Sequence, residues 1–138
     1  MGREIRRAAV LGAGVMGSGI AAHLANAGIP VLMLDIVPPM LSDDDQKSGL
    51  TENDPRFRNK FALAGLEGIK KSKPAALYSP KALPLIEIGN FEDDWDRLAE
   101  CDWIVEVVLE RLDVKQQVFA RLEEVRKPDA IVSSNTSG

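Results

Sequence analysis

Gly12-Ala13-Gly14-Val15-Met16-Gly17 is the stretch that decides the fold of this 138-residue chain. It follows the apolar residues 8–11 and precedes residues with helical spacing, so the pattern G-x-G-x-x-G stands between a strand and a helix. In such a turn the first glycine makes the bend, the second lets a pyrophosphate approach the backbone, and the third lets the helix pack on the strand. The sequence therefore predicts a dinucleotide-binding turn at a helix N-terminus. The alternative is a glycine-rich turn without a ligand.

An acidic residue stands where a dinucleotide-binding unit needs one. Asp35 ends the second predicted strand, residues 31–35, close to the expected distance of about 20 residues after the glycines. A carboxylate there accepts hydrogen bonds from the ribose hydroxyls of NAD and repels the 2′-phosphate of NADP. Ile36 and Val37 supply no cation to offset that repulsion. The sequence thus predicts NAD as the cofactor.

The rest of the chain alternates between apolar runs and helical patterns. Strands are predicted at residues 5–11, 31–35, 85–88, 103–109 and 130–132, and helices at 15–27, from 54 to near 73, 91–100 and 113–127. Residues 36–53 are predicted as a long polar loop, and the helix after Asp54 is predicted to carry Phe57, Phe61, Ala64 and Ile69 as its apolar side. This alternation is typical of an α/β fold. We predict one Rossmann-type domain over residues 1–138, a doubly wound parallel sheet of order 3-2-1-4-5 with helices on both faces and a helical excursion after the second strand.

The composition of the chain argues against several classes of partner and site. The net charge is −4, from 17 basic and 21 acidic residues, which argues against nucleic acid as a partner. We expect no metal site and no membrane span, and we predict a cytoplasmic protein. The single cysteine, Cys101, is expected as a small core or surface residue rather than as a nucleophile. The single histidine, His23, lies off the apolar face of its helix, so we expect it at the surface or between helices rather than in catalysis.

Two groups of charged residues leave alternatives open. Six cations cluster after the polar loop, and they either bind a phosphorylated ligand or form a solvated helix face: Arg56, Arg58, Lys60, Lys70, Lys71 and Lys73. Glu106 interrupts the apolar run of the fourth predicted strand, so it either lies near the strand end or is paired.

Three stretches resemble the 3-hydroxyacyl-CoA dehydrogenase family. They are the glycine motif continued by Ser18-Gly19-Ile20-Ala21, the run from Asp102 to Lys115, and Ser134-Asn135-Thr136-Ser137. The stretch from Lys73 to Asn90 is also similar to the long multifunctional fatty-acid oxidation proteins. The resemblance implies NAD-linked oxidation of an L-3-hydroxyacyl-CoA to the 3-oxoacyl-CoA in fatty-acid β-oxidation.

The resemblance also implies roles for single residues. Residues Gly12, Ala13, Gly14, Val15, Met16 and Gly17 would hold the cofactor together with Asp35, Glu110, Lys115 and Ser137. Ser137 would also be catalytic, bonding the substrate's 3-oxygen or lying against the nicotinamide; otherwise it caps the next helix. Lys60, Lys70, Lys71 and Lys73 would meet the coenzyme A phosphates of the acyl-CoA substrate.

One departure from the family is that this sequence ends at Gly138, before the general base that the family uses for catalysis. The family's general base is a histidine oriented by a glutamate, and both follow the Asn-Thr-Ser turn, as does a helical domain that forms the dimer. The chain therefore resembles the N-terminal NAD-binding domain of a larger enzyme, truncated and expected to be inactive alone, whose full-length form is a homodimer or part of a fatty-acid oxidation complex. The alternatives are a non-catalytic NAD-binding or redox-sensing module and another hydroxyacid dehydrogenase.

Overall fold

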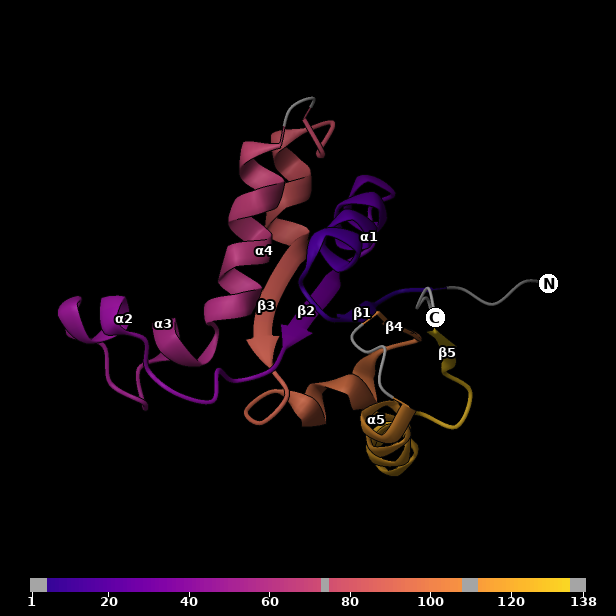
Figure 1. Ribbon diagram of the computed structural model, residues 1–138. Coiled ribbons are helices and arrows are strands. Elements are labelled where there is room, and N and C mark those ends of the chain that lie inside the picture. The colour runs from indigo at the N-terminus through magenta and orange to yellow at the C-terminus, as the bar shows by residue number, and fades with distance from the viewer. Residues whose placement is uncertain (1–4, 73–74, 108–111, 135–138) are drawn as a thin grey trace.

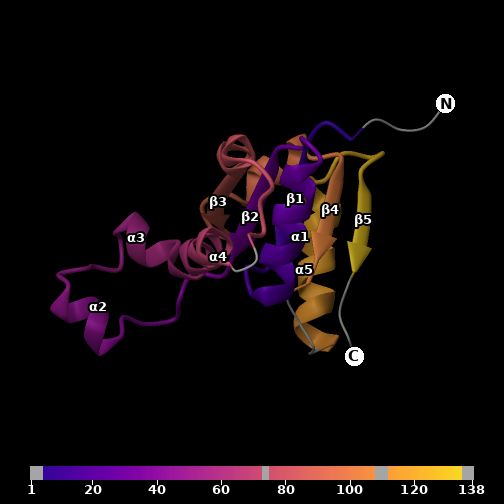
Figure 2. The same cartoon turned by 90° about the horizontal axis from the view of Figure 1, so that it is seen from above.

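The computed structural model describes residues 5–72, 75–107 and 112–134, and backbone alone is considered for 112–115. Five parallel strands form one sheet in the order β3-β2-β1-β4-β5 (Figure 2). The strands are β1 (Ala8–Leu11), β2 (Val31–Asp35), β3 (Ile86–Asn90), β4 (Trp103–Glu106) and β5 (Ile131–Ser134). The predicted fold class and strand order are confirmed.

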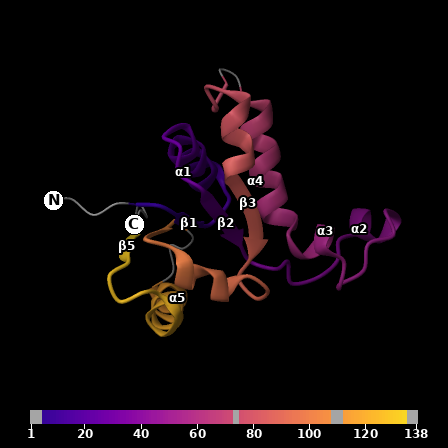
Figure 3. The same cartoon turned by 180° about the vertical axis from the view of Figure 1, so that it is seen from behind.

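Helices cover both faces of the sheet (Figure 1). One face carries α1 (Val15–Asn26) and α4 (Lys60–Lys71), and the other carries α5 (Leu112–Val125) and the 3-10 helix η2 (Trp95–Glu100). The short helices α2 (Asp43–Lys47) and α3 (Pro55–Arg58) project beyond the β3 edge of the sheet, and a 3-10 helix η1 (Pro80–Leu85) leads into β3 (Figures 2 and 3).

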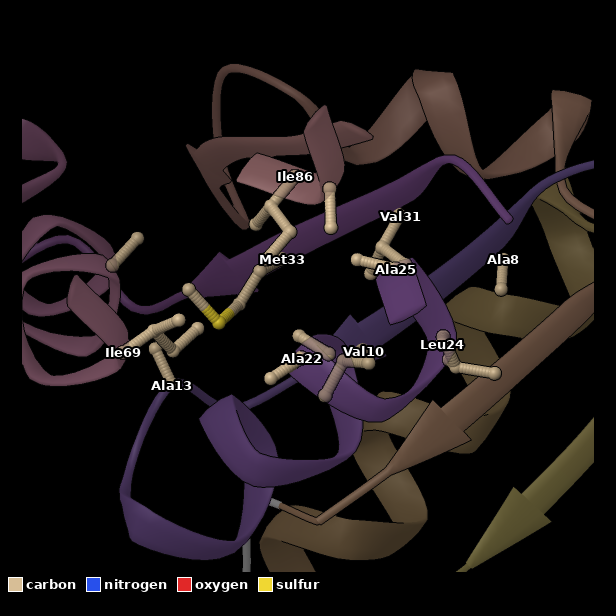
Figure 4. Close-up of a cluster of buried hydrophobic side chains, with 13 residues drawn as sticks. Ala8, Val10, Ala13, Ala22, Leu24, Ala25, Val31, Met33, Ile69 and Ile86 are labelled. Carbon is tan, nitrogen blue, oxygen red and sulfur yellow. The ribbon is translucent and has the colours of Figure 1, made fainter. Parts of the chain in front are cut away.

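Two apolar layers hold this arrangement together. On the α1 side, alternate strand residues such as Val10 and Met33 meet the small residues of α1, among them Ala22 and Ala25 (Figure 4). On the α5 side, Leu11 and the other strand residues that point that way pack against η2 and α5. Because successive strand residues point to opposite faces, the nearly continuous apolar runs seen in the sequence fill both layers.

The helix predicted from Asp54 to near residue 73 is two helices, and this prediction was wrong. The chain breaks at Asn59, whose side-chain oxygen accepts a hydrogen bond of 2.8 Å from Nδ2 of the buried Asn90 at the end of β3. The break shifts the helical phase, so α4 buries Ala62, Gly65 and Ile69. Phe61 and Ala64, which were predicted on the apolar side, are exposed.

Other local predictions also need correction. The polar loop contains α2, because the Ser42 side chain accepts from the Asp45 backbone N–H and the Asp45 side chain accepts from the Ser42 backbone N–H, which is a capping box. The predicted helix at 91–100 shrinks to η2, since the Asp94 carboxylate accepts from the Asn90 backbone N–H and fixes a turn first. Most of η1 lies within residues 75–84, where neither a helix nor a strand was predicted. No helix in the described parts of the chain is long and apolar enough to span a bilayer.

Candidate cofactor site

The glycine turn lies at the carboxyl end of β1, where the chain enters α1. Gly12 has φ of 116°, a conformation that favours glycine, and its backbone N–H donates to the Leu34 carbonyl at 2.7 Å. A Cβ atom on Gly17 would lie 1.8 Å from the Gly12 carbonyl oxygen. The turn therefore closes only because Gly17 has no side chain, which is the role predicted for the third glycine of the motif.

The amino end of α1 is open to a ligand. Gly14 caps the helix without a side-chain hydrogen bond, and the first turn carries no acidic residue. A Cβ atom on Gly14 would meet nothing within 4 Å, and Val15 next to it is 94% exposed. Free N–H groups and the helix dipole favour an anion at such an end. This geometry fits the pyrophosphate of a dinucleotide.

Asp35 links the end of β2 to the glycine turn. Its Oδ2 accepts a hydrogen bond from the Ala13 backbone N–H at 2.8 Å, and its Oδ1 accepts from Ile36 at 2.7 Å. A carboxylate has about four acceptor positions, so each oxygen keeps one for a ribose hydroxyl. Asp35 is therefore fixed in place and still able to bind a sugar.

Helix α4 packs against the turn, a contact that the sequence did not reveal. A Cβ atom on Gly65 would lie 2.5 Å from the Ala13 carbonyl oxygen, and Ala13 and Ile69 belong to one buried cluster (Figure 4). Gly65 thus lets the helix that follows the α2–α3 excursion touch the cofactor turn directly. The only sequence signal was a glycine in the middle of a helical pattern.

Two grooves lie near the turn. One begins beside Asp35 and is lined by Ile36, Val37, Pro38, Pro39, Phe91, Glu92 and Arg121. The other runs between α1 and the strands β4 and β5, and is lined by Val15, Met16, Gly19, Ile20, His23, Leu24, Trp103, Val105, Ser133 and Ser134. The second groove includes Val15 and Met16 at the start of α1 and continues along that helix to Trp103 at the amino end of β4, whereas the first begins one residue after Asp35.

The predicted coenzyme A lysines do not form one cluster. Lys60 begins α4 and Lys70 lies ten residues later, which separates them by about 15 Å along the axis. Lys60 contacts Asp45 at 2.9 Å, and the backbone N–H of Ser42 and the Lys60 ammonium lower the pKa of that nearly buried carboxyl. Lys70 and Lys71 contact the exposed Glu67 at 3.3 and 3.9 Å. Lys60 is thus tied into the fold, whereas Lys70 and Lys71 keep weak, exposed partners.

The two arginines of the basic cluster are also paired. Arg56 contacts Asp54 at 2.9 Å, and Arg58 contacts Asp93 at 2.7 Å. The hydrogen bond from Arg58 lowers the pKa of the Asp93 carboxyl. Arg58 therefore ties the α3–α4 break to the turn after β3.

Several predicted site residues lie outside the described residues. Lys73, Glu110 and Ser137 fall in the undescribed segments, and the side chain of Lys115 near the start of α5 is also outside the description. Their predicted roles stay predictions. The described residue nearest to Ser137 along the chain is Ser134, whose Oγ donates a hydrogen bond of 2.8 Å to Oε2 of Glu106. Both readings of Glu106 hold, because it ends β4 and its buried carboxyl is paired with Ser134.

The single cysteine and the single histidine differ in exposure. Cys101 is fully buried, and burial raises the pKa of its thiol to about 11, which keeps it protonated and unreactive at neutral pH. His23 is exposed, as predicted, eight residues or about 12 Å along α1 from its start. Among the described side chains, no group of three or more histidines, cysteines or carboxylates could hold a metal ion.

Comparison with known proteins identifies the family. Residues 7–138 match the family described as "3-hydroxyacyl-CoA dehydrogenase, NAD binding domain". The chain is 54% identical over 138 residues to a "Probable 3-hydroxyacyl-CoA dehydrogenase" of Bacillus subtilis, covering 100% of this chain and 18% of that protein. It is 37% identical over 134 residues to a "Fatty acid oxidation complex subunit alpha" of Pseudomonas putida, covering 97% of this chain and 16% of that protein.

Solved structures agree with the sequence comparisons. The chain resembles the (S)-3-hydroxybutyryl-CoA dehydrogenase PaaH1 of Ralstonia eutropha with a TM-score of 0.61 and 27% identity, covering 97% of this chain and 42% of that one. The chain spans less than half the length of each of these three proteins. Together with the glycine turn and Asp35, these matches show that the chain belongs to the 3-hydroxyacyl-CoA dehydrogenase family and is its NAD-binding domain.

Proposed function

We propose that the full-length protein containing this chain oxidises (S)-3-hydroxyacyl-CoA to 3-oxoacyl-CoA with NAD in fatty-acid β-oxidation. The observation that carries the proposal is the glycine turn bonded to Asp35, found in a chain of this family. Relatives named as dehydrogenases and as a fatty acid oxidation complex subunit support the substrate class. The name of the complex subunit also supports assembly of the full-length protein within such a complex, and a homodimer stays a prediction. A cytoplasmic location stays a prediction.

We propose that NAD lies across the carboxyl edge of the sheet, with its two ends directed toward the two grooves. We place the adenosine beside Asp35, the pyrophosphate at the start of α1, and the nicotinamide toward the groove that Ser133 and Ser134 line. When bound there, NAD would supply the hydride acceptor for the oxidation at C3 of the substrate. This chain's own part is to hold the cofactor and to present the residues after Ser134, where the proposed Ser137 contact follows. Glu110 and Lys115 are proposed to lie beside the cofactor.

Calorimetric titration with NAD, NADP and acetoacetyl-CoA tests the proposed function. NAD is expected to bind at least tenfold more tightly than NADP, because a 2′-phosphate about 4 Å from Asp35 costs about 4 kcal/mol at an effective dielectric of 20, before solvent and rearrangement reduce it. Asp35→Asn keeps an acceptor for the Ala13 N–H and removes the charge, so it should narrow the preference. Asp35→Ala should also weaken NAD itself. Equal affinities of the unmodified protein for the two cofactors would contradict the assignment.

Removing Lys70 and Lys71 at the end of α4, together with Lys73, tests the coenzyme A contact. In the full-length protein, alanine at Lys70, Lys71 and Lys73 together should raise KM for acyl-CoA more than KM for NAD. It should also flatten the salt dependence of KM, since contacts between exposed charges are screened. Stability should hardly change, because exposed ion pairs contribute about 0–1 kcal/mol. An unchanged KM for acyl-CoA would make these lysines a solvated helix face.

Lys60→Ala is the matched comparison, and it should lower stability instead. It leaves the nearly buried Asp45 carboxylate without its ammonium partner and loosens α2 from α4. Since the folded pKa of Asp45 is lowered, the pair stabilises the fold above the unfolded pKa of about 3.9 and is lost as pH falls through the folded pKa. The difference in melting temperature between the variant and the unmodified protein should therefore be constant from about pH 5 to pH 8 and shrink in more acidic solution.

A further inference from the structure

Glu106 is an unusual residue for its position. It is the last residue of β4, in an otherwise apolar strand, and its exposure is 0%. Burying a carboxylate is costly unless it is hydrogen-bonded, and an apolar residue of similar volume often stabilises such a site equally well or better. Stability alone therefore does not account for an acid here.

The neighbours of Glu106 place it at the cofactor edge. In the sheet register Glu106 lies between Leu11 of β1, which directly precedes the glycine turn, and Ser134 of β5. Strands β1 and β4 are adjacent although they are not consecutive, so the chain reverses its direction of winding between them. Ligands of such sheets bind outside the carboxyl ends of the strands at this reversal.

The contact with Ser134 connects Glu106 to the segment that follows β5. Ser134 Oγ donates to Glu106 Oε2 at 2.8 Å, and the same residue lines the groove beside α1. On the other face of the sheet a second hydrogen bond joins the same two strands, in which the indole N–H of Trp103 donates to Ser133 Oγ at 2.9 Å. Strand β5 has one neighbouring strand in the described sheet, which is β4. The two side-chain hydrogen bonds therefore add to a single set of backbone hydrogen bonds.

We propose that Glu106 is a positioning residue that acts through Ser134. It fixes the carboxyl end of β5, directly before residues 135–137 in the chain, at the nicotinamide end of the site. The catalytic part of this inference rests on the proposed function, whereas the structural part, the fixing of β5, does not. Glu106 itself touches neither cofactor nor substrate in this proposal.

Three variants of the full-length protein separate positioning from packing. Glu106→Gln keeps the volume and an oxygen that can accept from Ser134, so it should preserve kcat within about threefold. Glu106→Leu keeps much of the volume and removes the acceptor, and Ser134→Ala removes the donor at an exposed position where folding is not at risk. Each of these two should lower kcat for (S)-3-hydroxybutyryl-CoA at least tenfold, while Kd for NAD stays within about threefold.

Two further measurements complete the test. The double variant Glu106→Leu with Ser134→Ala should be no slower than the worse single variant, because both single variants already remove the Glu106–Ser134 hydrogen bond. Hydrogen exchange of the peptide covering residues 131–138 should speed up at least tenfold in both single variants, with the β1 peptide unchanged. Unchanged exchange there would overturn the inference whatever the activity. Faster exchange with unchanged kcat would overturn its catalytic part. Faster exchange in a protein whose unmodified form does not oxidise hydroxyacyl-CoA would support the fixing of β5 and overturn the proposed function instead.

Discussion

Gly17→Ala is expected to destabilise the domain by about 3 kcal/mol and to lower its affinity for NAD by more than about a hundredfold. The added methyl group would lie 1.8 Å from the Gly12 carbonyl oxygen, where no side-chain rotation can relieve the clash. The backbone of the turn must move, and with it the amino end of α1. Thermal unfolding and calorimetric titration with NAD measure the two effects.

Two other glycines of the same stretch provide the controls. A methyl group on Gly14 meets nothing within 4 Å, so Gly14→Ala should cost no more than about 1 kcal/mol of stability, the usual difference between glycine and alanine at an N-cap, and should still weaken NAD binding, because it fills the space offered to the pyrophosphate. Gly19 also has open space around it and lies inside α1, so Gly19→Ala should stabilise the domain by up to about 1 kcal/mol. Equal stability of the Gly17 and Gly19 variants would contradict the close packing of Gly17 on Gly12.

The 138-residue chain expressed alone is expected to bind NAD weakly and to show no detectable oxidation of 3-hydroxybutyryl-CoA. The cofactor turn and Asp35 are present, but the resemblance to the family places the general-base histidine outside these residues. General acid–base catalysis contributes about 10²–10⁴-fold to rate, and loss of substrate positioning lowers the rate further. NADH absorbance after addition of 3-hydroxybutyryl-CoA measures turnover, with the full-length protein as the positive control.

His23 decides how an unexpected activity would be interpreted. It is the only histidine in the sequence, and it lines the groove that we assign to the nicotinamide end. Turnover by the 138-residue chain that disappears in His23→Ala would place the general base on α1. Turnover that survives this change would assign the base to another residue. Either result would overturn the expectation that catalysis needs residues beyond these. An inactive full-length protein that still binds NAD would favour a non-catalytic NAD-binding module.

The elements of the sheet were largely predictable because their signals are local. Each strand is a short apolar run, and the glycine motif fixes the first strand-to-helix connection. The alternation of strands with helices and the right-handed crossovers between parallel strands then lead to the order β3-β2-β1-β4-β5. The placement of Asp35 followed from the same logic, since it ends the strand beside β1. The sequence by itself thus determined the family, the fold and the position of the cofactor turn.

Contacts between segments that are distant in the sequence decided where the helices break and which polar side chains pair. Asn59 breaks a predicted helix because it meets Asn90, 31 residues away, and Lys60 is tied to Asp45 rather than joined to Lys70 in one patch. Gly65 reaches the cofactor turn, and Glu106 finds its partner in Ser134, only after helices and strands have packed. Helical periodicity and residue type describe neighbours within one or two turns. Which buried polar group meets which partner depends on the relative placement of whole elements, and only the tertiary structure supplies that.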